Sequence, residues 1–171
     1  GQDSIDRGAL AGLIGITLVI VTMIGYYRFA GVLSVFALIF YGLMLMGSLA
    51  ALGATLTLPG IAGIVLSIGM AVDANVLIFE RVREELAIGR SPRMAVSEGF
   101  SNALSAIVDS NLTTLITAGV LFQFGTGPIR GFAVTLAIGI IASMFTAIFV
   151  TRTFFMLYLD RRPATAQALS I

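Results

Sequence analysis

The sequence predicts an all-α membrane protein with five transmembrane helices in an antiparallel bundle. Of its 171 residues, 58% are hydrophobic and only 11% are charged, whereas about 25% of the residues in a soluble domain are charged. Five apolar stretches each approach the ~20 residues that a helix needs to cross the hydrocarbon core of a bilayer. Most of the loops between them are short, which favours antiparallel neighbours.

The five stretches are continuously apolar and lack the alternation that is typical of barrel strands. Because backbone groups in lipid must be hydrogen-bonded internally, we expect helices. Their predicted bounds are 8–26, 31–53, 60–79, 103–124 and 132–156. They form a predicted transmembrane domain over 8–158, between an extracytoplasmic lead-in at 1–7 and a cytoplasmic tail or linker at 159–171.

The one long connection, from Glu80 to about Asn102, is predicted to contain a further helix. Ser91 is a good N-cap, and Pro92 fits the first helical position. Apolar residues then recur at roughly helical spacing, at Met94, Val96, Phe100, Leu104 and Ile107. We therefore expect an amphipathic helix at about 92–102 that lies at the cytoplasmic interface and continues into the fourth span.

The arginines predict the orientation. All ten basic residues are Arg, and only Arg7 and Arg130 fall on one side of the predicted membrane. The other eight define the cytoplasmic side under the positive-inside rule, which places the N-terminus outside and the C-terminus in the cytoplasm. No signal peptide is visible, so we expect at least one earlier span to precede this chain. The cytoplasmic set is Arg28, Arg81, Arg83, Arg90, Arg93, Arg152, Arg161 and Arg162.

Asp73 gives the clearest functional signal. It lies thirteen residues after Gly60, roughly 20 Å into a ~30 Å core. A carboxylate at that depth costs several kcal/mol, and intramembrane acids commonly carry protons. We therefore take Asp73, with Asn75 in the same apolar run, as a candidate for proton coupling. The alternative is a hydrogen-bonded carboxyl group that only fixes helix packing.

Asp109 is a second candidate for proton coupling. It shares one predicted helix face with other polar residues, at Asn102, Ser105, Thr113 and Thr117, and this face is widened by Ser110, Asn111 and Thr114. Such a polar row should face protein or water, and it could line a hydrated path from the cytoplasm toward Asp73. For its Ser and Thr residues we favour the alternative, which is hydrogen bonding between helices.

A charged motif follows the third stretch and is predicted to lie at the cytoplasmic boundary. Its members are Glu80, Arg81, Arg83, Glu84 and Glu85. Its two arginines are expected to anchor in lipid headgroups or to pair with Glu84 and Glu85, at tenths of a kcal/mol per pair. No Arg lies deep in an apolar span, so a cationic partner for the intramembrane acid would have to come from another chain.

Small residues every four positions along the fifth span predict a helix-packing face. They are Gly131, Thr135, Gly139, Ser143, Ala147 and Thr151.

The sequence offers no set of residues for covalent or metal-assisted catalysis. It contains no Cys and no His, and it has no phosphate-binding loop. We expect no enzyme activity, no metal and no cofactor; the energy input would be an ion gradient, in which one charge crossing 100 mV supplies about 2.3 kcal/mol. The net charge of +1 gives no indication of a nucleic-acid partner.

Three segments, Gly1–Ile5, Gly69–Leu86 and Asp109–Ile116, resemble the SecD/SecF family of bacterial protein-export membrane proteins, and the SecD side of it in particular. The resemblance implies one half of a pseudo-symmetric, RND-like set of helices, of which this chain holds helices two to six. It also implies a SecF partner, separate or fused downstream, and association with the SecYEG channel.

The resemblance further implies that the proton-motive force drives assistance to preprotein translocation across the cytoplasmic membrane. Asp73 matches the intramembrane acid of that family. The preprotein would be held by a periplasmic domain that this chain lacks. Two other functions are retained as alternatives: a non-catalytic scaffold for assembling SecF and the channel, and half of an RND-type exporter.

Overall fold

The computed structural model describes residues 2–54, 56–161, 169 and 171, and every regular element in these ranges is a helix. Four helical stretches are long and apolar enough to cross a membrane, namely α1, α2, α3 and the continuous run from Gly127 to Asp160. The prediction of an all-α membrane protein is thus confirmed. The elements are α1 (Gln2–Ala51), α2 (Leu58–Ala87), α3 (Pro92–Phe124), α4 (Gly127–Phe145), the π-helical η1 (Thr146–Thr151) and α5 (Arg152–Asp160).

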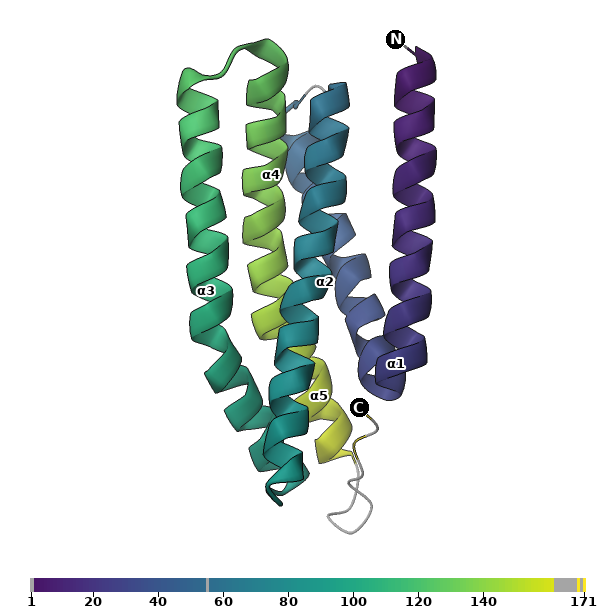
Figure 1. The fold of residues 1–171 in the computed structure, drawn as a ribbon, viewed down its shortest axis with the longest axis vertical. Helices are drawn as coiled ribbons and strands as arrows, with labels where there is room; N and C mark the ends of the chain where they lie inside the picture. The colour runs from purple at the N-terminus through teal and green to yellow at the C-terminus, as the bar shows by residue number, and fades with distance from the viewer. Residues whose placement is uncertain (1, 55, 162–168, 170) are drawn as a thin grey trace.

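Helix α1 consists of two limbs joined at Arg28. The backbone of Arg28 is non-helical, with φ 46° and ψ −112°. Figure 1 shows that α1 descends from the N-terminus, reverses, and returns toward the same end of the bundle. The reversal is tight, because a Cβ atom at Gly31 would lie 2.9 Å from the backbone nitrogen of Ile24. It falls within the connection that the sequence predicts at residues 27–30.

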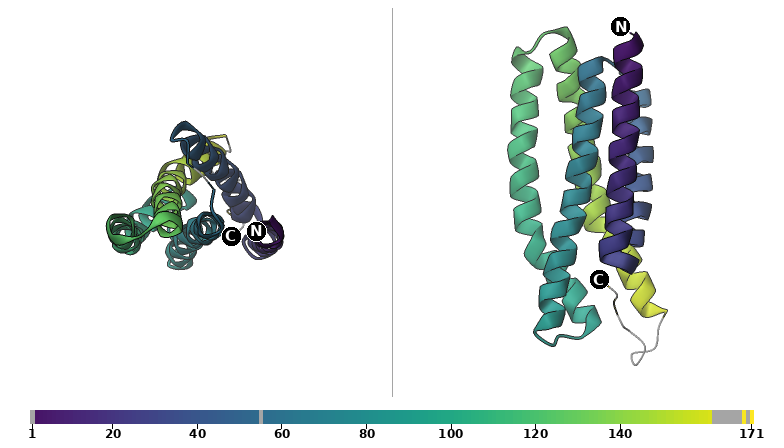
Figure 2. Two further views of the ribbon diagram at one scale, coloured as in Figure 1. Left: turned by 90° about the horizontal axis from the view of Figure 1, so that it is seen from above. Right: turned by 45° about the vertical axis from the view of Figure 1, so that its right-hand side comes forward.

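Helix α2 lies at the centre of the bundle and contacts α1, α3 and α4 (Figure 2). It begins after Thr57, whose hydroxyl accepts a hydrogen bond from the backbone nitrogen of Gly60 at 3.2 Å. That bond satisfies one of the amide groups left free at a helix start. The helix continues to Ala87, so the charged motif is helical and prolongs the predicted third span by two turns.

The small-residue face of the fifth span packs against α2, as predicted. A side chain at Gly139 would collide with Ser67 on α2, so only glycine allows this close approach. At the same level, the Tyr41 hydroxyl of α1 and the Ser67 hydroxyl lie 2.6 Å apart. The other stripe residues from Thr135 to Thr151 are buried, at Thr135, Ser143, Ala147 and Thr151.

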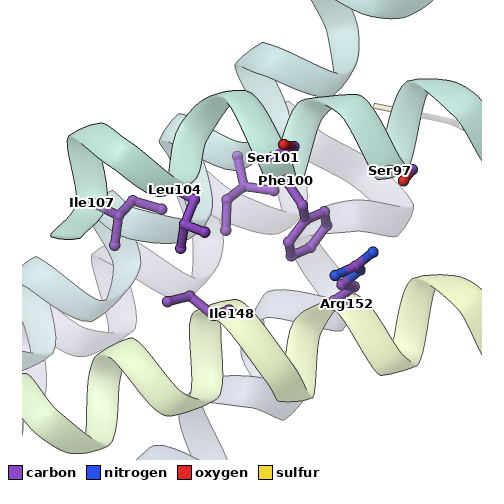
Figure 3. A pocket seen from close by; sticks show the side chains of 8 residues that line it. Ser97, Phe100, Ser101, Leu104, Ile107, Ile148 and Arg152 are labelled. Carbon is purple, nitrogen blue, oxygen red and sulfur yellow. The ribbon is translucent and has the colours of Figure 1, made fainter.

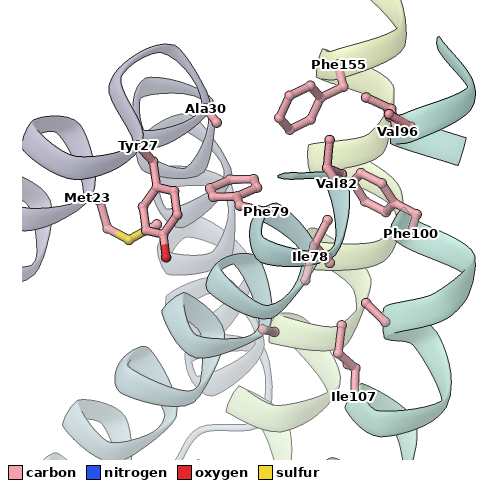
Figure 4. Packing of buried hydrophobic residues seen from close by; sticks show 14 of the residues in the cluster. Met23, Tyr27, Ala30, Ile78, Phe79, Val82, Val96, Phe100, Ile107 and Phe155 are labelled. Atoms are coloured by element: carbon pink, nitrogen blue, oxygen red, sulfur yellow. The ribbon is translucent and has the colours of Figure 1, made fainter. Parts of the chain in front are cut away.

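An aromatic cluster joins four elements near the end of the bundle that carries the α1 reversal (Figure 4). Phe155 of α5 lies between Phe79 of α2 and Phe100 of α3, with ring centroids 5.7 and 6.2 Å apart. Tyr27 reaches Phe79 from the α1 reversal, with 5.4 Å between centroids. Edge-on ring pairs at such distances add about 0.5–1.5 kcal/mol beyond the area that they bury.

Helix α3 begins where the sequence predicts. Ser91 is its N-cap and accepts from the Met94 nitrogen at 3.4 Å, with Pro92 in the first turn. The helix then runs to Phe124 without a break, so the expected amphipathic segment and the fourth span form one continuous element. The predicted tail at 159–171 falls largely outside the described residues, although α5 extends into it as far as Asp160.

Candidate functional site

Asp73 lies on the open side of α2. It is fifteen residues beyond Leu58, about 22 Å along the helix axis. Its side chain is exposed in this chain, and it forms neither a hydrogen bond nor an ion pair with any described residue. The carboxyl group is therefore presented outward from the middle of an apolar helix.

The surroundings of Asp73 on that side are open, and two of the residues that share its face, Ala62 and Gly69, are small. Exposed residues recur at helical spacing along α2, at Ala62, Leu66, Gly69 and Asp73. A Cβ atom at Gly69, one turn from Asp73, would meet nothing within 4 Å. Small residues allow two membrane helices to approach closely. This stripe, which we call the Asp73 face, has the shape of a helix-docking surface with one carboxyl group in it.

Asn75 lies on the opposite side of α2 from Asp73, because two residues along a helix correspond to about 200° of rotation. It is 4% exposed. Its Oδ1 accepts a hydrogen bond from the Thr151 hydroxyl at 2.9 Å, and its Nδ2 donates to the Ala71 carbonyl at 3.2 Å. The structure therefore separates the two residues that the sequence groups together, and Asn75 connects α2 to η1.

Asp109 and its polar row lie on the outer side of α3. Asn102, Ser105, Asp109, Thr113 and Thr117 are all exposed. The hydroxyls of Thr113 and Thr117 donate to carbonyl oxygens one turn back in α3 itself, at 2.9 and 3.1 Å. The favoured expectation of hydrogen bonds between helices is thus not met for these two threonines.

Asn111, which the sequence adds to the same polar row, is buried instead of exposed. This residue is 4% exposed, and its Nδ2 donates to the Ile107 carbonyl at 2.7 Å. Its Oδ1 is buried without a partner among the described residues.

The charged motif forms two kinds of contact. Glu80 accepts from the Tyr27 hydroxyl at 2.9 Å and from the Arg83 guanidinium at 3.1 Å. Arg83 also donates to the Tyr26 hydroxyl at 3.1 Å and lies over that ring, 5.0 Å from its centroid. These four side chains fasten the α1 reversal to the lower end of α2, two turns from Asp73.

The remaining motif residues pair within α2 or contact the segment that follows it. Arg81 pairs with Glu84 at 2.8 Å, one of the predicted pairs. Glu85 instead accepts from Asn102 of α3 at 3.0 Å and pairs with Arg90 at 2.6 Å. The pair of Arg81 with Glu84 is exposed, so it contributes at most about 1 kcal/mol to stability.

Sequence reasoning missed Tyr26, Tyr27 and Thr151 as partners of the candidate site. Two tyrosines at the end of an apolar span are a membrane-interface signal and could have indicated the contact with the charged motif. Thr151 gave no such signal beyond its place in the small-residue stripe. In the part of the chain that the structure describes, no group of three or more acidic residues could hold a metal ion.

The fold and the site define a multi-pass membrane protein with carboxyl groups in its apolar helices, an arrangement typical of proteins that move ions or use their gradients. A sequence model described as "Protein export membrane protein SecD/SecF, C-terminal" matches residues 1–161. The chain belongs to this family.

Relatives named "Protein translocase subunit SecD" support the assignment. That of Desulfurispirillum indicum is 63% identical over 163 residues, which are 95% of this chain and 32% of the relative. That of Pseudomonas aeruginosa is 58% identical over 152 residues, 89% of this chain and 24% of the relative. The chain thus spans about a third or less of the length of these relatives.

A solved structure shows the same fold. The crystal structure of SecDF from Thermus, described as a translocon-associated membrane protein, matches with a TM-score of 0.91 at 44% sequence identity. The match covers 94% of this chain and 22% of that one.

Proposed function

We propose that this chain is the membrane part of a SecD-type subunit, which uses the proton-motive force to assist preprotein translocation by the Sec export machinery. Membership of the family and relatives named as SecD support the export role. The proton-driven part rests on Asp73, and the chain contributes no enzymatic step of its own.

We further propose that α1 crosses the membrane twice, which gives five crossings. Its 50 residues would measure about 75 Å if straight, against a ~30 Å core. The reversal at Arg28 divides it into two limbs of sufficient length. With five crossings and eight arginines on one side, the N-terminus lies outside the bacterial cytoplasmic membrane and the C-terminus lies inside.

The observation that carries the proposal is the outward direction of Asp73. A carboxyl group in contact with lipid would cost several kcal/mol, so it requires cover from protein or water. The chain leaves the Asp73 face open, and Gly69 allows another helix to approach it closely. We propose that a SecF half covers this face, while the SecYEG channel and the preprotein contact other parts of the assembly.

Once covered, Asp73 would lie away from bulk water beside groups of a second chain. Burial disfavours the ionised form of a carboxyl group, and a nearby cation favours it. A change in the separation of the two halves would therefore change the surroundings of the Asp73 carboxyl group. This is the property needed to couple proton passage to movement, and a hydrated route past Asp109 on α3 is a proposed path of supply.

The decisive experiment replaces Asp73 by Asn in the whole protein and measures preprotein export and proton conduction in vesicles. Asn keeps the size and the hydrogen bonding but cannot ionise. We expect an assembled complex that has lost both activities. The matched control is Asp6→Asn, which makes the same chemical change at an exposed position near the N-terminus and should leave both intact.

Two outcomes would contradict the proposal. Normal export with Asp73→Asn would exclude proton coupling at this residue and favour the scaffold function. Loss of SecF from the purified complex would show that Asp73 holds the two halves together, and loss of export would then follow from disassembly.

A further inference from the structure

A cavity of about 220 Å³ opens between α3 and the junction of η1 with α5, away from the Asp73 face. Figure 3 shows that Ser97 and Arg152 lie toward one end of it, whereas Leu104, Ile107 and Ile148 lie toward the other. Ser101 adds a second hydroxyl to the lining. The cavity therefore has a polar end with a positive charge and an apolar end.

Arg152 is available to bind an anion. Within the described residues its guanidinium group has no hydrogen bond, ion pair or ring contact. The one acid of its own helix, Asp160, is already paired with Arg93 of α3. A guanidinium group presents several donors in a fork that matches the oxygens of a phosphate.

The direction of the polarity matches the proposed orientation of the chain. On α3, the chain leads toward the side that carries most of the arginines when it is followed back from Ile107 to Ser97. On the last span, it leads toward the same side when it is followed on from Ile148 to Arg152. The charged end of the cavity thus lies near the cytoplasmic interface, and its apolar end points into the membrane. Basic pockets between membrane helices on this side are a known setting for lipid headgroups.

The face of α3 that lines this cavity also lines a separate hollow nearer the opposite end of the helix. Leu115 and Phe122 lie eighteen residues, or five helical turns, beyond Ser97 and Leu104, on the same face of α3. With α4 they line a second hollow of about 380 Å³ whose lining is almost entirely apolar. Within the first cavity, the change from a charged end to an apolar end is the pattern of a phospholipid, and a free phosphate would have no use for the apolar end.

We propose that this cavity binds an anionic phospholipid of the cytoplasmic leaflet, with its phosphate held by Arg152, Ser97 and Ser101 and one acyl chain against Leu104, Ile107 and Ile148. The site joins α3 to α5 beside the aromatic cluster, whose Phe100 also lines the cavity. It goes beyond the proposed export function and does not depend on Asp73.

The test uses a tryptophan reporter. Residues 1–171 contain no Trp, so Leu104→Trp in the whole protein, with any tryptophan outside this range replaced by Phe, gives a single fluorophore at the cavity rim. The protein is reconstituted in phosphatidylcholine vesicles that contain increasing fractions of brominated phosphatidylglycerol or brominated phosphatidylcholine. Bromine quenches tryptophan only at close range, so quenching reports lipid at the site.

We expect phosphatidylglycerol to quench at about a fivefold lower lipid fraction than phosphatidylcholine, the effect of one arginine near an anionic lipid. Arg152→Gln should abolish this preference, and Arg152→Lys should keep most of it. The matched control is Arg161→Gln, which removes an exposed charge from the same side and should change the preference by less than about twofold. A reporter at Leu43, 67% exposed on α1, should show no preference.

Equal quenching by the two lipids would overturn the proposal. An equal loss of the preference for phosphatidylglycerol in Arg152→Gln and Arg161→Gln would also overturn the proposal. Such a result would reveal only a general attraction of anionic lipid to a basic surface. Recovery of fluorescence on addition of inorganic phosphate would assign the site to free phosphate. If Arg152→Gln lacks the helix content of the parent by circular dichroism, the double variant Ser97→Ala, Ser101→Ala replaces it, and an unchanged preference in that variant would equally overturn the site.

Discussion

The two sides of α2 differ in how completely this chain satisfies them. On the inner side, Ser67 meets Tyr41, Asn75 meets Thr151, and Gly139 of α4 allows the backbones to approach closely. On the outer side, Asp73 has no partner among the described residues, and Gly69 faces open space. The inner side is complete within one chain, whereas the outer side is left open, as the proposed contact with a SecF half requires. Substitutions on the inner side should therefore affect folding. Substitutions on the outer side should affect assembly and function.

The largest difference is expected between two glycines. Gly139→Leu should prevent native packing of α4 on α2, with a loss of about 3 kcal/mol or more, because a side chain there collides with Ser67. Gly69→Leu should change the free energy of unfolding by less than about 0.5 kcal/mol but reduce recovery of SecF with the purified protein. Denaturation in sodium dodecyl sulfate and co-purification measure the two effects. The comparison fails if Gly69→Leu also unfolds the chain.

A smaller effect is expected for the bond between Asn75 and Thr151. Thr151→Val removes the donor and leaves a buried Asn75 oxygen unsatisfied, which should destabilise the protein by about 1–3 kcal/mol. The double variant Asn75→Leu, Thr151→Val should be less destabilised than the sum of the two single changes. Thermal unfolding in detergent measures this, with Asp73→Asn as the control that should leave the unfolding temperature unchanged. Strict additivity would show that the hydrogen bond contributes nothing.

The smallest effects are expected where α1 meets the charged motif. Tyr27→Phe removes only the hydroxyl that donates to Glu80, and should destabilise the protein by about 1 kcal/mol because the acceptor is charged and the ring is buried. Arg81→Gln removes an exposed pair with Glu84 and should lie within about 0.5 kcal/mol of the parent. The same unfolding measurement ranks the two, and the reverse order would contradict the assignment of Glu80 as the anchor of the α1 reversal.

Much of the fold could be predicted from sequence because apolar length and turn residues act locally. Ser91 and Pro92 start α3 as expected, and the breaks before α2 and α4 fall in the predicted connections. The reach of α2 to Ala87 was harder to predict. Charged residues end an apolar stretch without ending a helix, particularly where pairs such as Arg81 with Glu84 stabilise the next turn.

The arrangement of the candidate site could not be predicted in the same way. Asp73 and Asn75 are indistinguishable by their position in an apolar run, and only tertiary packing, with Thr151 of η1 against Asn75, decides which of them is buried. The role of Tyr27 likewise depends on the reversal at Arg28, which brings residues 53 positions apart in sequence into contact. Such contacts depend on tertiary packing, which no local pattern encodes.

The π-helical turn η1 has a consequence for register along the last span. Residues four apart drift by about 40° per step on a straight α-helix, so a long stripe of fours would turn away from its neighbour. The wider turn absorbs one additional residue, and burial accordingly continues at Thr151, Phe155 and Leu159. Inserting one further residue that this turn cannot absorb would rotate α5 by about 100°, so that Phe155 would leave the aromatic cluster and Arg152 would leave its cavity together. A single residue in this turn thus sets the angular phase of everything that follows it.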